Sequence, residues 1–144
     1  MKLHLPNLFA TGALAARLAR AARPGDCLLL EGPLGAGKSA FARAFLRAMA
    51  DDAALEVPSP TFTLVQAYDM PGGMTAWHFD LYRLDGPHGL AELGWEEARD
   101  GLALVEWPDR LGRLAPPDAL RLTLEPLEGE ARRATLAGWE GRAW

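Results

Sequence analysis

Continuous apolar runs alternate along the chain with stretches in which apolar residues recur at helical spacing. Cys27–Leu30 and Leu102–Glu106 are apolar runs, and runs of this length are typical of parallel strands buried on both faces. Helical spacing is found over Leu8–Ala22, where Asn7 is a natural N-cap, and over Lys38–Ala50. The alternation of strand and helix predicts an α/β fold.

Two hairpins and a short edge strand are expected in addition. Turn-forming residues separate Thr63–Tyr68 from Met74–Asp80, and Leu120–Glu125 from Arg132–Ala137, so each pair is predicted to form a hairpin. Lys2–Leu5 is expected to be the edge strand. Short helical turns are predicted at Leu90–Arg99 and Asp109–Leu111. Hairpins added to strand–helix units imply a mixed central sheet.

Composition narrows the class of protein. The 144 residues are 49% hydrophobic and 24% charged, which suits one folded domain over residues 1–144 with a substantial core. The formal net charge is −4, which makes the chain a poor candidate for binding nucleic acid alone. Its apolar runs are too short to span a membrane, and the N-terminal MKLHLPNLF lacks the apolar core of a signal peptide, so a cytoplasmic protein is expected. The single cysteine, Cys27, excludes an internal disulfide and is expected to be a small buried hydrophobic residue.

A glycine-rich segment between the first apolar run and the next helix carries the most specific chemical signal. The pattern G-x-x-x-x-G-K-[ST] is matched in full by Gly32, Pro33, Leu34, Gly35, Ala36, Gly37, Lys38 and Ser39. The glycines let backbone N–H groups turn toward a β-phosphate, and the helix that follows directs its positive end to the same anion. In this pattern the lysine neutralises β- and γ-phosphate oxygens, and the serine hydroxyl ligates magnesium. The segment predicts a P-loop, and with it a three-layer sandwich of the P-loop NTPase type whose mixed central sheet is mainly parallel.

The nucleotide is predicted to be ATP, bound with Mg²⁺. Guanine-specific P-loop proteins commonly recognise the base through an Asn-Lys-x-Asp loop. The only lysines are Lys2 and Lys38, and neither follows an asparagine. The device that would select GTP is therefore absent.

A metal bound to the phosphates needs an acidic partner, usually at the end of a nearby strand. Asp80 ends the segment TAWHFD and Glu106 ends LALVE, so both carboxylates have this placement. The residues alone leave open which of the two contacts the metal directly, and both are predicted to act in catalysis with Lys38. His78, two residues before Asp80, is instead expected to be a packed, hydrogen-bonded core residue.

The segment SPTFT, Ser59–Thr63, lies between the P-loop helix and the next strand, where many NTPases carry a switch loop. Pro58 and Pro60 favour extended backbone in the residues that precede them. A hydroxyl group at this place can sense a γ-phosphate, and Thr61 is the candidate.

Four segments occur together in a family-specific order and spacing: PGDCLLLEGPLGAGKSAFARAFL, VPSPTFTLVQAYD, HFDLYRL and LVEWPDRLG. From about Thr11 to Leu114 the chain resembles the TsaE family, formerly called YjeE. Its members are bacterial P-loop ATPases needed for the threonylcarbamoyl modification of the tRNA adenosine beside the anticodon. The residues after Leu114 match the family more loosely.

The resemblance implies roles for single residues around the phosphates. Ser39 and Glu106 take the positions of magnesium ligands, and Asp80 takes the Walker-B-like position. Ser59–Thr63 matches the family's switch segment. Trp107 matches a tryptophan that follows the metal-binding glutamate in the family.

Further nucleotide contacts are implied outside the glycine-rich pattern. Thr11 and Arg132 match positions near the nucleotide in the family, with Arg133 as an alternative to Arg132. Ala40, which also belongs to the implied nucleotide site, stands where the family usually has a second threonine. It therefore lacks a hydroxyl that could touch the α-phosphate. Pro33 replaces a polar residue and should stiffen the loop.

The resemblance also implies partners. The protein would act with the TsaB–TsaD pair, in which TsaD carries out threonylcarbamoyl transfer, and ATP hydrolysis would reset that complex between turnovers. The tRNA would be held by the partners. The alternative is a P-loop kinase for a small metabolite, which would need an arginine-rich lid where the segment YRLDGPHGLAEL supplies only Arg83. A nucleotide-binding module without turnover is a third possibility.

Overall fold

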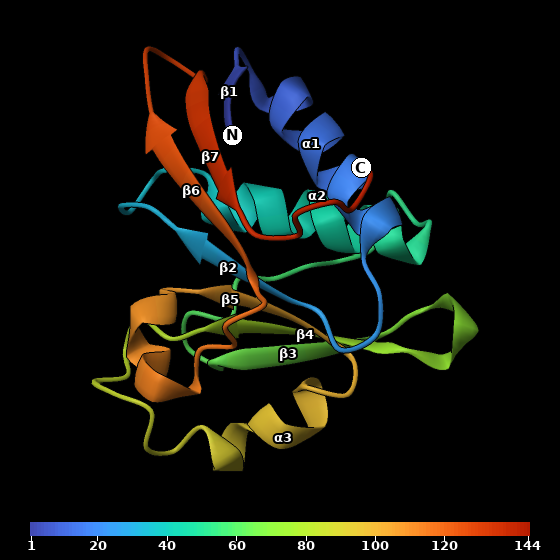
Figure 1. Ribbon diagram of the computed structural model, residues 1–144, viewed down its shortest axis with the longest axis vertical. Coiled ribbons are helices and arrows are strands. Elements are labelled where there is room, and N and C mark those ends of the chain that lie inside the picture. Colours follow the sequence, from blue (N-terminus) through green and yellow to red (C-terminus); the bar gives the residue numbers. More distant parts are fainter.

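A seven-stranded mixed sheet forms the centre of the computed structural model, which describes residues 1–144 (Figure 1). Its strands lie in the order β1-β7-β6-β2-β5-β4-β3. Their bounds are Lys2–Leu5 for β1, Cys27–Glu31 for β2, Val65–Asp69 for β3, Thr75–Asp80 for β4, Leu102–Glu106 for β5, Leu120–Pro126 for β6 and Arg132–Ala137 for β7. The four central strands, β6, β2, β5 and β4, are parallel, and the pairs toward both edges are antiparallel. The expected mixed sheet is thus confirmed, with its parallel pairs confined to the centre.

Helices cover both faces of the sheet. Helices α1, Leu8–Ala21, and α2, Lys38–Ala50, lie on one face, and α3, Trp95–Ala98, lies on the other (Figure 1). Three short 3-10 helices complete the structure at Pro71–Gly73, Ala91–Leu93 and Pro108–Leu114. The side chain of Asn7 accepts a hydrogen bond from the backbone N–H of Ala10 at 2.9 Å, which confirms the predicted cap of α1. No helix is both long enough and apolar enough to cross a membrane.

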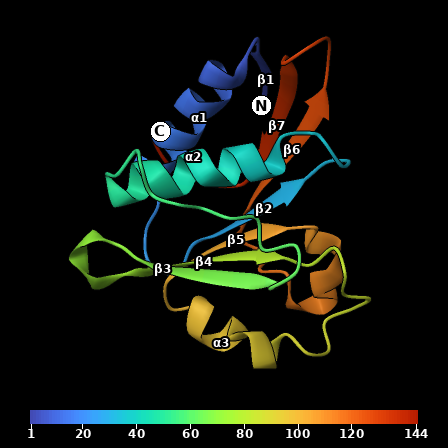
Figure 2. The ribbon, with the colours of Figure 1, turned by 180° about the vertical axis from the view of Figure 1, so that it is seen from behind.

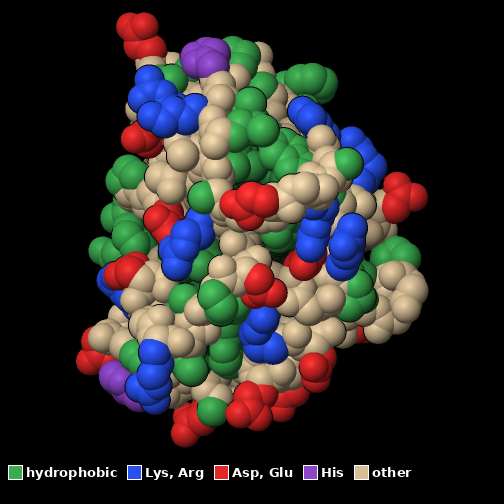
Figure 3. Space-filling view, viewed as in Figure 1, with side chains coloured by type: hydrophobic (Ala, Val, Ile, Leu, Met, Phe, Trp, Pro, Cys, Tyr) green, Lys and Arg blue, Asp and Glu red, His purple; other side chains and the backbone are tan.

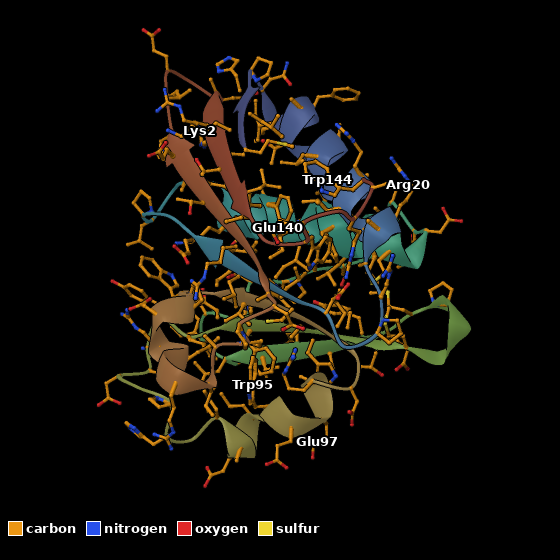
Figure 4. All side chains as sticks on the ribbon, in the orientation of Figure 1. Lys2, Arg20, Trp95, Glu97, Glu140 and Trp144 are labelled. Atoms are coloured by element: carbon orange, nitrogen blue, oxygen red, sulfur yellow. The ribbon has the colours of Figure 1, made fainter.

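The two faces of β2 contribute to two separate hydrophobic cores. Leu28 and Leu30 pack on the side of α1 and α2, whereas Cys27 and Leu29 pack on the side of α3. Burial raises the pKa of the Cys27 thiol to about 12, so this group stays protonated, as expected of a core residue. Figure 4 shows Trp95 of α3 directed toward the sheet and Glu97 directed away from it. Strand β2, which leads into the glycine-rich loop, is therefore packed on both faces by the helices of the two outer layers.

One strand boundary differs from the sequence-based prediction by more than one residue. The hairpin strand expected at Thr63–Tyr68 begins at Val65 instead. Pro60–Leu64 forms a turn, closed by a hydrogen bond of 2.7 Å from the N–H of Leu64 to the carbonyl oxygen of Pro60. Leu64 has a positive φ of 71°, which an extended strand does not allow. The segment after α2 runs back across the molecule before it enters β3 (Figure 2).

The parallel pairing brings several chain segments to one edge of the sheet. Glu106 at the end of β5 lies opposite Leu30 of β2 on one side and opposite Asp80 of β4 on the other. Because parallel strands end at the same edge, the glycine-rich loop and both carboxylates emerge side by side. This edge is where ligands bind in open α/β sheets.

Candidate functional site

The glycine-rich loop has the backbone that its sequence demands. A Cβ atom on Gly32 would lie 2.5 Å from the carbonyl oxygen of Leu124, so a larger residue would force β2 and β6 apart. Gly37, the N-cap residue directly before α2, has a φ of 103°, a conformation that L-residues rarely adopt. The first turn of α2 therefore points its free N–H groups into the loop, which is the arrangement that binds phosphate.

Lys38 is buried at the centre of this loop, with only 5% of its surface exposed. Its ammonium donates hydrogen bonds to the carbonyl oxygens of Gly32 and Pro33 and lies 3.6 Å from the centre of the Trp107 ring. Burial lowers the pKa of Lys38, and the nearby carboxylates of Glu106 and Asp80 oppose that shift. A cation held this way is ready to exchange carbonyl partners for phosphate oxygens.

Asp80 and Glu106 face the loop from neighbouring strands. The Ser39 hydroxyl donates to Oε1 of Glu106 at 3.1 Å, and both carboxylates are at least 95% buried. Asp80 accepts hydrogen bonds from the Thr61 hydroxyl at 3.1 Å and from the backbone N–H of Tyr82 at 3.0 Å. A hydroxyl and two carboxylates form a set of hard oxygen donors, which fits Mg²⁺ in the presence of phosphate oxygens.

A hollow of about 270 Å³ joins these groups. Its lining consists of Leu34, Gly35, Ala36, Gly37, Lys38, Ser39, Ala40, Thr61, Asp80, Glu106 and Trp107. Nine of the predicted site residues are therefore brought together around one space. Gly32 lies beside it, where its carbonyl oxygen holds Lys38.

Two other predicted nucleotide contacts, Thr11 and Arg132, lie next to this hollow. Thr11 is buried on α1 and lines a neighbouring hollow of about 390 Å³, which shares Ala40 with the first. Arg132 donates from Nε to the carbonyl oxygen of Ala36 at 2.8 Å and from Nη2 to that of Gly35 at 3.2 Å. In this structure its guanidinium supports the loop from outside the phosphate hollow.

The alternative to Arg132 has a different environment. Arg133 is half exposed and pairs with Glu125 at 3.4 Å, because successive side chains of β7 point to opposite faces. It makes no hydrogen bond to the glycine-rich loop, so the geometry favours Arg132 for this place.

Sequence reasoning missed Arg110, which joins the segments that follow Asp80 and Glu106. Its Nε donates to the carbonyl oxygen of Leu84 at 3.0 Å and its Nη2 to that of Tyr82 at 3.3 Å. The guanidinium also lies 5.6 Å from the centre of the Trp107 ring. Its place three residues after Trp107, which follows strand β5, was the available signal, but its partners come from a distant part of the chain.

The expected switch segment contacts the site through Thr61 alone among its hydroxyls. Ser59 bonds to the Thr61 hydroxyl at 2.8 Å, whereas the Thr63 hydroxyl accepts from the side chain of Gln66 at 3.0 Å. Arg83, the single arginine of the segment YRLDGPHGLAEL, lies over the ring of Phe62 at 4.9 Å. Thr61 therefore links the segment directly to a carboxylate of the candidate metal site.

Comparisons with known proteins agree on one family. The model of the family "Threonylcarbamoyl adenosine biosynthesis protein TsaE" matches residues 5–134. The chain is 39% identical over 127 residues to a tRNA threonylcarbamoyladenosine biosynthesis protein TsaE from Rickettsia conorii, covering 88% of this chain and 71% of that protein. It is 33% identical over 137 residues to the protein of the same name from Bacillus subtilis, covering 94% and 84%. The crystal structure of Bacillus subtilis YdiB superposes with a TM-score of 0.74 at 29% identity, covering 94% of this chain and 83% of that one.

Proposed function

The chain belongs to the TsaE family of threonylcarbamoyladenosine biosynthesis proteins, and from this premise we propose that it is a magnesium-dependent ATPase of that pathway. Its place in the modification of tRNA follows from its family. The ATPase activity is supported by one observation above the others. The glycine-rich loop, Lys38 and two buried carboxylates surround a single hollow at the edge of the sheet.

Each part of this hollow has a task in the proposed reaction. The N–H groups at the start of α2 and the ammonium of Lys38 bind the β- and γ-phosphates. Ser39, Glu106 and Asp80 would hold Mg²⁺, which neutralises charge on the phosphate oxygens when bound. Arg132 and Thr11 would contact the nucleotide beyond the phosphates. ATP is proposed over GTP because the guanine-recognition loop is absent.

Thr61 would connect the presence of a γ-phosphate to the rest of the molecule. Its hydroxyl bonds to Asp80, yet the segment that carries it belongs to no helix or long strand. Such a segment can order around a γ-phosphate and relax when the phosphate leaves. We propose that this is the switch through which hydrolysis is communicated to partners.

The proposed partners are TsaB and TsaD. Lys38 is the single cation that lines the phosphate hollow, so a partner that supplies a further positive charge or fixes the switch would accelerate hydrolysis. We propose that tRNA is reached only through this complex, in the cytoplasm, with residues 1–144 acting as one domain. On the face seen in Figure 3, Lys and Arg side chains are interspersed with Asp and Glu, and no continuous basic tract is present.

The test is steady-state ATP hydrolysis by the protein alone and with TsaB–TsaD, for the wild type, Thr61→Ala and Thr63→Ala. The wild type should hydrolyse ATP slowly alone and faster with the partners. Thr61→Ala should bind nucleotide but lose the stimulation. Thr63→Ala is the matched control, because its hydroxyl bonds to Gln66 and to no carboxylate.

Two outcomes would contradict the proposal. Full activity alone, with no response to TsaB–TsaD, would refute partner dependence. Phosphate transfer to a member of a panel of small metabolites would instead support the kinase alternative.

A further inference from the structure

His78 is buried beside the candidate metal site, and no role described so far uses it. It lies on β4 two residues before Asp80, and its side chain is 1% exposed. Its Nε2 atom lies 2.7 Å from Oε2 of Glu106, whose side chain is 3% exposed. The packed, hydrogen-bonded histidine expected from the sequence is therefore present, but its partner is a carboxylate of the site.

The bond to Glu106 is the only hydrogen bond that the His78 ring makes. Its other nitrogen, Nδ1, is buried without a partner. The Ser39 hydroxyl lies closer to Oε1 of Glu106, at 3.1 Å, than to Oε2, at 3.4 Å, whereas His78 bonds to Oε2 alone. If His78 served only to fill space in an apolar layer, both ring nitrogens would be buried without hydrogen bonds, which costs free energy.

We propose that His78 is a positioning residue that fixes the Glu106 carboxylate so that Oε1 faces Ser39 and the magnesium position. The terminal torsion angle of a glutamate side chain has a broad energy minimum, so an unrestrained Glu106 carboxylate would rotate about that bond. A hydrogen bond from Nε2 to one oxygen removes that freedom before the metal arrives. Partners of this kind, behind metal ligands, typically contribute 10–100-fold to metal affinity. The inference rests on the proposed magnesium site.

The experiment compares two amide substitutions. The side-chain nitrogen of glutamine can reach the place of Nε2, whereas that of asparagine reaches only the place of Nδ1, where the structure offers no acceptor. His78→Gln and His78→Asn therefore bury similar polar groups but differ in the bond to Glu106. His88→Asn is the control for loss of a histidine, because His88 is exposed and pairs with Asp85.

The measured quantity is the Mg²⁺ concentration that gives half-maximal tightening of ATP binding. His78→Asn should need roughly tenfold more Mg²⁺ than the wild type, and His78→Gln should stay close to the wild type. ADP affinity in EDTA should be the same in all four proteins, which shows that the phosphate loop is intact. Equal Mg²⁺ requirements in the Asn and Gln variants would overturn the inference, as would unequal ADP affinities in EDTA.

A second measurement needs no nucleotide or metal. The chain has 3 histidines, so ¹⁵N spectra of the imidazole groups can be assigned with His78→Gln and His88→Asn. Nε2 of His78 should carry a proton, because it donates to the carboxylate. An unprotonated Nε2 would overturn the inference even if one of the variants fails to fold. A wild type whose ATP binding ignores Mg²⁺ would instead refute the proposed magnesium site.

Discussion

Replacement of Lys38 by alanine should abolish tight ATP binding and leave the protein folded. A hydrogen bond to a charged group contributes about 1.5–3 kcal/mol, and the ammonium of Lys38 would make two of them, one to a β- and one to a γ-phosphate oxygen. Their loss corresponds to roughly 10²–10⁴-fold in the dissociation constant. The effect should be larger for ATP than for ADP, because ADP lacks the γ-phosphate.

The effect of the same change on stability should be small, since two contributions oppose each other. Alanine removes a cation whose charged form is disfavoured by burial, but it also removes the ammonium that donates to the carbonyl oxygen of Gly32, whereas that of Pro33 keeps the N–H of Ala36 as a donor. We expect the free energy of unfolding to change by no more than about 2 kcal/mol.

Calorimetric titration with Mg-ATP and Mg-ADP, together with urea unfolding, measures both quantities. Lys2→Ala is the matched control, because Lys2 is the only other lysine and lies exposed on the edge strand β1. It should leave nucleotide affinity unchanged. If the folded Lys38→Ala protein binds ATP within about tenfold of the wild type, a difference of 1.4 kcal/mol, the phosphate site is misplaced.

Two further predictions concern the charges around Lys38. Asp80→Ala and Glu106→Ala should each reduce ATP turnover much more than ADP affinity, because a metal contributes most where charge develops on the leaving oxygen. Turnover is measured as the rate of phosphate release. A normal rate in both variants would contradict the assignment. Burial lowers the pKa of Lys38 from 10.5, so the unfolded chain binds this proton more tightly than the folded protein. The free energy of unfolding should therefore gain a rising component between the lowered pKa and 10.5, and urea unfolding should show this component in the wild type and not in Lys38→Ala.

Most of the fold could be predicted because its elements have strong local signals. The continuous apolar runs of β2 and β5 and the helical spacing of α1 and α2 identify these elements within one or two residues. The extent of parallel pairing could not be judged, because the hairpins attach to the sheet through long-range contacts. The start of β3 was missed because Leu64 adopts a left-handed backbone conformation, which a leucine side chain does not predict.

The site residues that lie within one short segment could be predicted from the sequence. Contacts between segments that are distant in the sequence were harder to predict. The glycine-rich pattern identifies every residue of the loop, and strand ends identify Asp80 and Glu106. The contacts of Arg132 with the loop and of Arg110 with Tyr82 depend on strand order and on the course of connecting segments. The partner of His78 depends on the register of β4 against β5, which sequence spacing leaves open.

The carboxylates of Asp80 and Glu106 together determine the net charge of the phosphate hollow. Lys38, Asp80 and Glu106 are the ionisable groups that line the hollow, so their formal charges leave it with an excess of negative charge. A polyphosphate entering such a space meets repulsion from both carboxylates, and at short range in a partly buried site this repulsion is weakly screened. A divalent cation reverses the sign of the hollow and turns both carboxylates from repelling groups into ligands. Two buried acids beside a phosphate loop are therefore an argument for a metal–nucleotide complex as the true ligand, and they imply that removal of Mg²⁺ weakens ATP binding more than ADP binding.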